Sequence, residues 1–195
     1  MRNVKLSALL KELEQFGLEN DAKAKDRSQK MLNITPDTGE FLLLLIRALK
    51  AKRVLEIGTS NGYSTLWLAQ AVQPLGGQVT TLELAPHKAD MARVNFQRTE
   101  LLAVIDLREG DAQSFIKQQP PASFEVIFLD ANRGQYATWW PNLQRILSPG
   151  GLVVVDNAVS HAKELESLTQ LIQQTDGYIT SLVPVGNGEL LILKD

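Results

Sequence analysis

The chain has 195 residues, 44% hydrophobic and 22% charged, which is enough for one globular domain and too little for two ordinary ones. It contains no cysteine, which excludes disulfides, thiolate nucleophiles and thiolate metal sites and suits a cytoplasmic protein. The formal net charge of −2 favours neither nucleic acid nor anionic lipid as a partner. We therefore expect a single cytoplasmic domain spanning residues 1–195 that acts on a small molecule, with no nucleic-acid or membrane partner.

The first 34 or so residues are predicted to be a helical extension. Apolar residues recur at helical spacing from Val4 to Phe16, and the polar stretch after them is typical of a solvated or mobile surface segment. A second helix is predicted from Pro36 to about Lys50, because Thr35 can cap it and proline suits a first helical turn.

Beyond residue 50, short apolar strands alternate with helical stretches. Strands are predicted at residues 53–57, 78–84, 104–108, 125–130 and 152–156, with helices beginning near Gly62, Pro86, Asp111, Gly134 and His161. Continuously apolar strands are typical of a parallel sheet that is buried on both faces by helices. The final strands, residues 178–184 and 189–194, flank a tight-turn signal at Asn187 and Gly188, which predicts a C-terminal antiparallel hairpin.

Polar residues follow the first strands, where ligands bind in open α/β sheets. Glu56 ends the first strand, and Gly58 and Gly62 permit a close approach to the backbone, although the spacing is not the GxGxxG of dinucleotide enzymes. Glu83 ends the second strand, where a carboxylate can accept both hydroxyls of a ribose, unless it is a plain surface residue. Asp111 is consistent with a helix cap, which would leave Ala112 to line an adenine pocket.

Three oxygen donors follow two later strands. Asp130 ends the fourth strand, and Asp156 and Asn157 end the fifth, so all three should meet at one rim of a parallel sheet. Such a set suits a hard cation, Mg²⁺, Mn²⁺ or Ca²⁺, whereas the alternative is a helix cap and a turn. His161 is near enough in sequence to contribute, although a lone histidine at a helix start is usually a surface residue.

The stretches RVLEIGTSNGYSTLWLA, EGDAQSF, FEVIFLDANRGQY, LSPGGLVVVDN and VGNGELLILK together resemble the metal-dependent O-methyltransferases of the bacterial, catechol and caffeoyl-CoA type, over roughly residues 31–194. The resemblance implies a Rossmann-like seven-stranded methyltransferase sheet, commonly in a homodimer, and S-adenosylmethionine as the methyl donor. It also implies backbone contacts from residues 31–35 and a small hydroxylated, aromatic acceptor. The implied cofactor residues are Glu56, Gly58, Ser64, Glu83, Ala112, Asp130 and Asn132, and the implied metal ligands are Asp130, Asp156 and Asn157.

The chain departs from this family after Asp130. The usual motif reads aspartate, alanine, aspartate, lysine, whereas Asn132 and Arg133 occupy the last two positions here. Asn132 keeps a hydrogen-bonding group without the charge, and Arg133 supplies a fixed positive charge but cannot accept a proton as lysine can. Asp130 and Arg133 are the candidate catalytic residues.

Two alternatives stay open at this point. One is a catalytically weak S-adenosylmethionine-binding protein, and the other is an NAD-dependent oxidoreductase on a similar sheet. The absent GxGxxG motif and the terminal hairpin weigh against the second. Tyr136, Trp139 and Trp140 are expected to pack in the core, with the two tryptophans facing differently.

Overall fold

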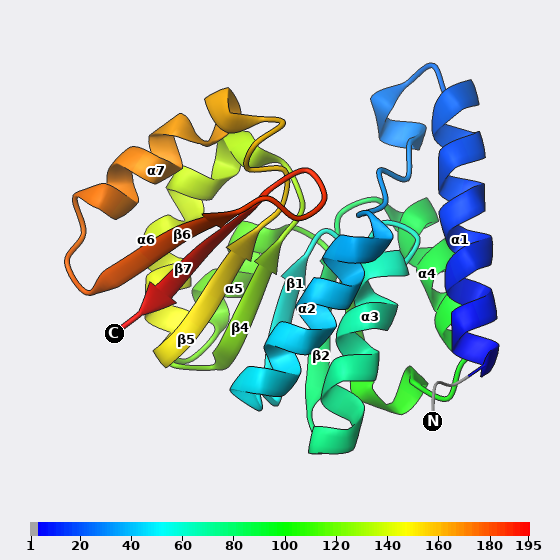
Figure 1. Cartoon of the computed structure of the whole chain (residues 1–195), viewed down its shortest axis with the longest axis horizontal. Coiled ribbons are helices and arrows are strands. Elements are labelled where there is room, and N and C mark those ends of the chain that lie inside the picture. Colours follow the sequence, from blue (N-terminus) through cyan, green and yellow to red (C-terminus); the bar gives the residue numbers. More distant parts are fainter. Residues whose placement is uncertain (1–3) are drawn as a thin grey trace.

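The computed structural model describes residues 4–195, and a seven-stranded sheet forms its centre (Figure 1). The order in the sheet is β3-β2-β1-β4-β5-β7-β6, with the first five strands parallel and β7 antiparallel to both β5 and β6. The predicted mostly parallel sheet with a terminal hairpin is therefore confirmed. The strands are β1 (Arg53–Ile57), β2 (Gln78–Glu83), β3 (Ile105–Glu109), β4 (Phe124–Leu129), β5 (Leu147–Val155), β6 (Tyr178–Val183) and β7 (Glu189–Lys194).

Helices cover both faces of this sheet (Figure 1). Successive residues of a strand point to opposite faces, so Val54 and Phe128 pack with the helices of one face, whereas Leu55 and Ile127 pack with those of the other. The first face carries α1 (Val4–Lys23), α2 (Pro36–Leu49), α3 (Tyr63–Val72) and α4 (Pro86–Gln97). The second carries α5 (Ala112–Gln118), α6 (Tyr136–Ile146) and α7 (Glu166–Gln173).

Helix α1 is longer than its apolar periodicity predicted. It continues to Lys23 and is followed by a short 3-10 helix, η1 (Arg27–Gln29). The polar residues 19–30 are exposed or half-buried, as expected for a solvated surface segment, although the first of them are helical. Tertiary contacts hold the continuation: the Asp21 carboxylate accepts from the backbone N–H of Met31 at 2.6 Å and of Leu32 at 2.8 Å. These contacts fold residues 24–34 back toward the sheet.

Helix α2 begins and ends as predicted. The Thr35 side chain accepts from the Thr38 N–H at 3.4 Å, and Lys50 ends the helix in the left-handed conformation, with φ of 55°. The Asp37 carboxylate of its first turn accepts from the Gly186 N–H at 3.0 Å. That bond ties the β6–β7 turn to the start of α2.

Two other boundaries differ from the expectation. Strand β5 begins at Leu147 and not at residue 152, because Leu147 already pairs with Phe124 of β4. The register then shifts, and pairing resumes between Val126 and Leu152. The helix expected from His161 is instead a 3-10 turn, η5 (Ala162–Leu165), followed by α7. Within residues 4–195, no helix is both long enough and apolar enough to cross a membrane.

Candidate active site

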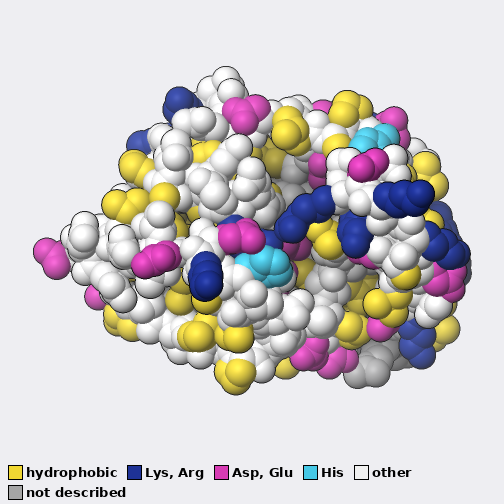
Figure 2. All heavy atoms as spheres, turned by 90° about the horizontal axis from the view of Figure 1, so that it is seen from above, with side chains coloured by type: hydrophobic (Ala, Val, Ile, Leu, Met, Phe, Trp, Pro, Cys, Tyr) yellow, Lys and Arg dark blue, Asp and Glu magenta, His cyan; other side chains and the backbone are white. Residues whose placement is uncertain are grey.

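A cavity of about 900 Å³ opens at the carboxyl edge of the parallel strands. Figure 2 looks down on this part of the molecule and shows a hollowed surface with basic, acidic and histidine side chains around it. Residues after β1, β2, β4 and β5 form the walls, and residues 27–34, which follow α1, cover part of them. This size suits a cofactor together with a small second substrate.

The loop after β1 brings backbone to the cavity. Gly58 has φ of 111°, and a side chain at this position would collide with the backbone carbonyl oxygen of Asp130. The glycine therefore lets the ends of β1 and β4 approach each other, and it also lines the cavity.

Glu56 lies behind the cavity wall. Its carboxylate is fully buried and accepts from the hydroxyls of Ser64 at 2.5 Å, Thr65 at 2.5 Å and Thr81 at 2.6 Å. Burial raises the pKa of Glu56 to about 7, against the opposing effect of these hydroxyl donors. Of this group it is Ser64, predicted to bind the cofactor, that reaches the cavity.

Glu83 faces the cavity from the end of β2. One carboxylate oxygen accepts from the Ser60 N–H at 2.7 Å and the other from the Ala85 N–H at 2.8 Å, which fixes the plane of the group. Asp111 caps α5 by accepting from the Ser114 N–H at 2.8 Å, and its neighbour Ala112 lines the cavity. These positions agree with a nucleoside pocket.

Asp130, Asp156 and Asn157 all line the other part of the same cavity. Burial raises the pKa of Asp130 well above its usual range, and the charge of Asp156 adds to the effect. Burial likewise raises the pKa of Asp156. Burial thus disfavours the charged form of both carboxyl groups, and the charge of Asp156 does so further for Asp130, so an added cation would be favoured here.

The donor set fits a hard cation. Among residues 4–195, no three acidic or histidine side chains are grouped so as to hold a metal ion, so a cation bound here would need Asn157 as a third donor. The Asn157 amide donates to Asp156 and its Oδ1 accepts from the Ser160 hydroxyl at 3.3 Å. A half-turn of the amide would present its oxygen beside Asp156.

A buried glutamate that the sequence did not single out lies against Asp156. Glu189, the first residue of β7, is fully buried, and one of its carboxyl oxygens accepts from the Thr38 hydroxyl at 3.1 Å. The antiparallel register pairs Val155 with Leu190 and so places Glu189 opposite Asp156. Only the pairing of β5 with β7 reveals this contact, which no local sequence signal indicates.

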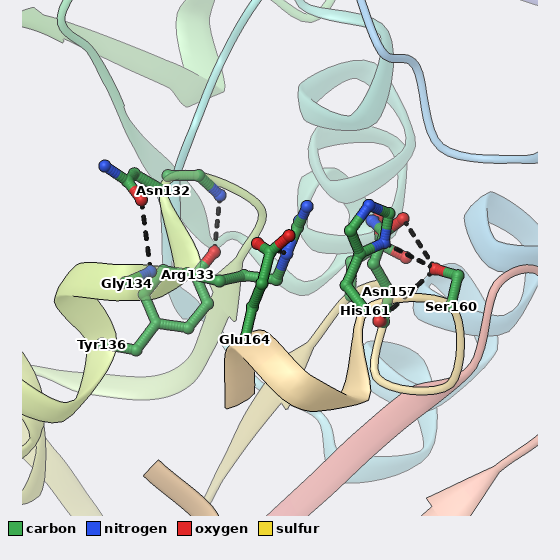
Figure 3. A network of polar contacts seen from close by, with 10 residues as sticks. Asn132, Arg133, Gly134, Tyr136, Asn157, Ser160, His161 and Glu164 are labelled. Atoms are coloured by element: carbon green, nitrogen blue, oxygen red, sulfur yellow. Dashed lines mark hydrogen bonds and ion pairs between the residues drawn. The ribbon is translucent and has the colours of Figure 1, made fainter. Parts of the chain in front are cut away.

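Arg133 begins the short 3-10 helix η4 (Arg133–Gln135) and is buried, with 6% of its surface exposed. Its Nε donates to the Glu164 carboxylate on η5 at 2.9 Å (Figure 3). The Asn132 side chain accepts from the Gly134 N–H at 3.2 Å and so caps η4, while Asn132 also lines the cavity. The local sequence gave no sign of the ion pair, because its two members lie 31 positions apart.

Several cavity residues were not predicted. Trp139 and Trp140 are both buried in the apolar cluster under α6, as expected, yet Trp139 also reaches the cavity. Lys88 of α4 donates to the Lys30 carbonyl oxygen at 2.6 Å and holds residues 27–34 over the cavity, and burial lowers its pKa. His161 lines the cavity and contacts the Ser160 hydroxyl through Nδ1 at 2.9 Å.

The cavity thus gathers nearly every residue predicted for the site, with Glu56 alone behind the wall. The lining residues among them are Gly58, Ser64, Glu83, Ala112, Asp130, Asn132, Arg133, Asp156 and Asn157. Of residues 31–35, expected to contribute backbone, residues 31–34 line the cavity as well and Thr35 does not. A seven-stranded sheet with this order and this strand-end cavity defines the class I methyltransferase fold.

Comparison with known proteins identifies the family. The profile of the O-methyltransferase family matches residues 2–194. The chain is 33% identical over 160 residues to a catechol O-methyltransferase of Niastella koreensis, covering 77% of this chain and 72% of that protein. It is 36% identical over 126 residues to a catechol O-methyltransferase of Mycobacterium tuberculosis, covering 65% of this chain and 57% of that protein.

A solved structure agrees with these matches. The O-methyltransferase of Bacillus cereus, in complex with S-adenosylhomocysteine, superposes with a TM-score of 0.81 at 27% identity, over 96% of this chain and 91% of that one. The chain belongs to the O-methyltransferase family and is an S-adenosylmethionine-dependent O-methyltransferase. This membership decides against the NAD-dependent oxidoreductase.

Proposed function

We propose that the protein methylates one hydroxyl of a small aromatic acceptor that carries two adjacent hydroxyls, with the help of a divalent cation. The observation that carries this proposal is the pair of carboxyl groups, half-buried Asp130 and buried Asp156, in the same cavity as Glu83. Two relatives that are named catechol O-methyltransferase support the acceptor class.

In this proposal the cofactor occupies the part of the cavity formed by the ends of β1 and β2. Glu83 accepts the two ribose hydroxyls, Ala112 borders the adenine, and the Gly58 backbone permits close approach. Ser64, Asp130 and Asn132 contact the methionine portion. Glu56 acts through Ser64, because its carboxylate holds that hydroxyl at 2.5 Å.

The cation would be held by Asp130, Asp156 and Asn157. When bound, it lowers the pKa of an acceptor hydroxyl and orients that oxygen toward the sulfonium methyl group. Arg133 contributes a fixed positive charge near the reacting oxygen but does not take its proton, because a guanidinium keeps its proton at neutral pH. The proton therefore leaves to solvent, and turnover should rise with pH until the hydroxyl is ionised.

The test is methyl transfer from S-adenosylmethionine to catechol with Mg²⁺ and with EDTA. Asp156→Ala should abolish the Mg²⁺-stimulated rate and leave affinity for S-adenosylhomocysteine within about twofold, because the two ligands occupy different parts of the cavity. Asp176→Ala, which removes an exposed carboxylate in the turn before β6, is the matched control. Full activity in EDTA would refute the metal assignment. Cofactor binding without turnover on any aromatic diol would instead indicate a catalytically weak binding protein.

We also propose that the protein is a cytoplasmic homodimer. The absence of cysteine supports the compartment, and the family resemblance supports the dimer. Light scattering coupled to size-exclusion chromatography would measure the molar mass, and a mass near that of one chain, 21.6 kDa, would contradict the dimer.

A further inference from the structure

Arg133 is a buried arginine that uses one of its five N–H groups for hydrogen bonds to the described residues 4–195. Its Nε donates to Glu164 at 2.9 Å, whereas neither Nη1 nor Nη2 donates to any side chain or carbonyl oxygen in residues 4–195. Unpaired N–H groups of a charged side chain are costly to bury without a partner or water. The remaining four N–H groups are therefore available to a ligand.

The free edge of the guanidinium can be reached from the cavity. Arg133 lines the cavity together with Asp130 and Asp156, but among the described residues its only ion pair is the one with Glu164. Figure 3 shows the end of the Arg133 side chain extending past the Glu164 carboxylate, on the side where His161 and Asn157 lie. Among residues 4–195, several side-chain nitrogen and oxygen atoms are shielded from solvent and have no hydrogen-bond partner, but the Nη atoms of Arg133 do not belong to this group. Because the Nη atoms have no partner in this part of the chain, they must be accessible, and the cavity that Arg133 lines provides that access.

Glu164 holds this edge in place. By accepting from Nε, its carboxylate fixes the plane of the guanidinium and leaves the two Nη groups as a fork. The Glu164 side chain is 49% exposed, so solvent screens its charge more than it screens that of buried Arg133. The ion pair therefore orients Arg133 without cancelling its attraction for an anion in the cavity.

We propose that Arg133 is a specificity-determining residue whose Nη1 and Nη2 groups bind a carboxylate on the acceptor, so that the preferred acceptors are aromatic diols bearing a carboxylate. This inference rests on the proposed function, since it assumes an aromatic diol in the cavity. A planar fork matches a carboxylate with two parallel hydrogen bonds, which a lysine ammonium cannot supply. A divalent cation would balance the charges of Asp130 and Asp156, which leaves the charge of Arg133 for the acceptor.

The experiment measures binding, without turnover, to the protein saturated with S-adenosylhomocysteine and Mg²⁺. Calorimetry compares 2,3-dihydroxybenzoate and 3,4-dihydroxybenzoate with their methyl esters, which keep the diol and lose the charge. At least one acid should bind about tenfold or more tightly than its ester. The two acids differ in the ring position of the carboxylate relative to the two hydroxyls, so the isomer that shows the preference identifies the position that Arg133 recognises.

Three variants test whether Arg133 is the cause of the preference for the acid over its ester. Arg133→Gln should weaken binding of the preferred acid at least about tenfold more than it weakens binding of the ester, because any effect on the diol is common to both ligands. Arg133→Lys, which can keep an ion pair with Glu164 and so guards against misfolding, should reduce the acid-to-ester ratio to about threefold or less, because a point charge replaces the fork. Lys163→Gln removes an exposed positive charge next to Glu164 and should leave the ratio unchanged.

Equal affinity of acid and ester in the unmodified protein would overturn this inference, as would an unchanged ratio in Arg133→Gln. Methylation of catechol, measured in parallel, separates this failure from that of the proposed function. If catechol is methylated and the ratio is near one, only the role of Arg133 is wrong. If no diol binds or reacts, both are overturned.

Discussion

Glu189 and Asp156 lie opposite each other at the end of the β5–β7 pair, with their carboxyl groups in contact inside the protein. Burial, followed by the charge of Asp156, raises the pKa of Glu189 to about 10. Burial and the charge of Asp156 therefore favour the neutral acid form of Glu189, which can donate to Asp156, while the Thr38 hydroxyl donates to its other oxygen.

The first prediction concerns this contact. Glu189→Gln should change the free energy of unfolding by less than about 1 kcal/mol, because an amide can still donate to Asp156 and accept from Thr38. Glu189→Leu should lower it by about 1–3 kcal/mol, since both partners lose a hydrogen bond inside the protein. Urea unfolding at pH 7 without added cation measures both, with exposed Glu40→Gln as the control. Equal stability of the Gln and Leu variants would show that the proton on Glu189 has no structural role.

The second prediction concerns the pH dependence of stability through Glu56. Its pKa is about 7 in the folded protein and 4.5 as the ordinary value, so the folded state binds more protons between these pH values. The contribution of Glu56 to stability is therefore fully present below about pH 4.5 and is lost as pH rises through about 7. At about 1.4 kcal/mol per pKa unit, the full loss is on the order of 3 kcal/mol.

Unfolding free energies of the unmodified protein and Glu56→Gln, measured from pH 4.5 to 8, isolate this contribution. The difference between the two curves should change across this window, because only the unmodified protein must ionise the buried group. Parallel curves would contradict the raised pKa of Glu56.

The third prediction tests the close approach at Gly58. Gly58→Ala should lower the free energy of unfolding by about 2–4 kcal/mol, because the added methyl group meets the Asp130 carbonyl oxygen and φ is 111°. Gly150→Ala is the matched control: its φ is also positive, at 71°, but the space around it is open. It should lose only about 1–2 kcal/mol, the cost of the left-handed backbone. Similar losses in the two variants would mean that strands β1 and β4 can separate at little cost.

The fourth prediction addresses cofactor affinity. Glu83→Ala should weaken binding of S-adenosylhomocysteine at least about tenfold, since hydrogen bonds to a charged acceptor contribute about 1.5–3 kcal/mol each. Glu83→Gln keeps one acceptor oxygen and should give an intermediate affinity. Calorimetry measures both variants, and circular dichroism checks that the loop anchored at Ser60 and Ala85 leaves the fold intact. Affinity equal to that of the unmodified protein would remove Glu83 from the cofactor site.

The sequence by itself determined the architecture and the composition of the cavity rim. Apolar runs with turn residues between them set the order of strands and helices, and Asn187 with Gly188 indicated the final hairpin, because these signals are local. Glu83, Asp130 and Asp156 could be assigned to one edge without coordinates, since the carboxyl ends of parallel strands meet at the same edge.

The tertiary structure alone decided what each side chain at that edge contacts. It placed Glu56 behind Ser64, set Glu189 against Asp156, and paired Arg133 with Glu164. It also continued α1 to Lys23 and anchored residues 27–34 over the cavity through Lys88. These contacts join residues far apart in the chain and depend on strand register and side-chain direction, which the local pattern of apolar and polar residues does not specify.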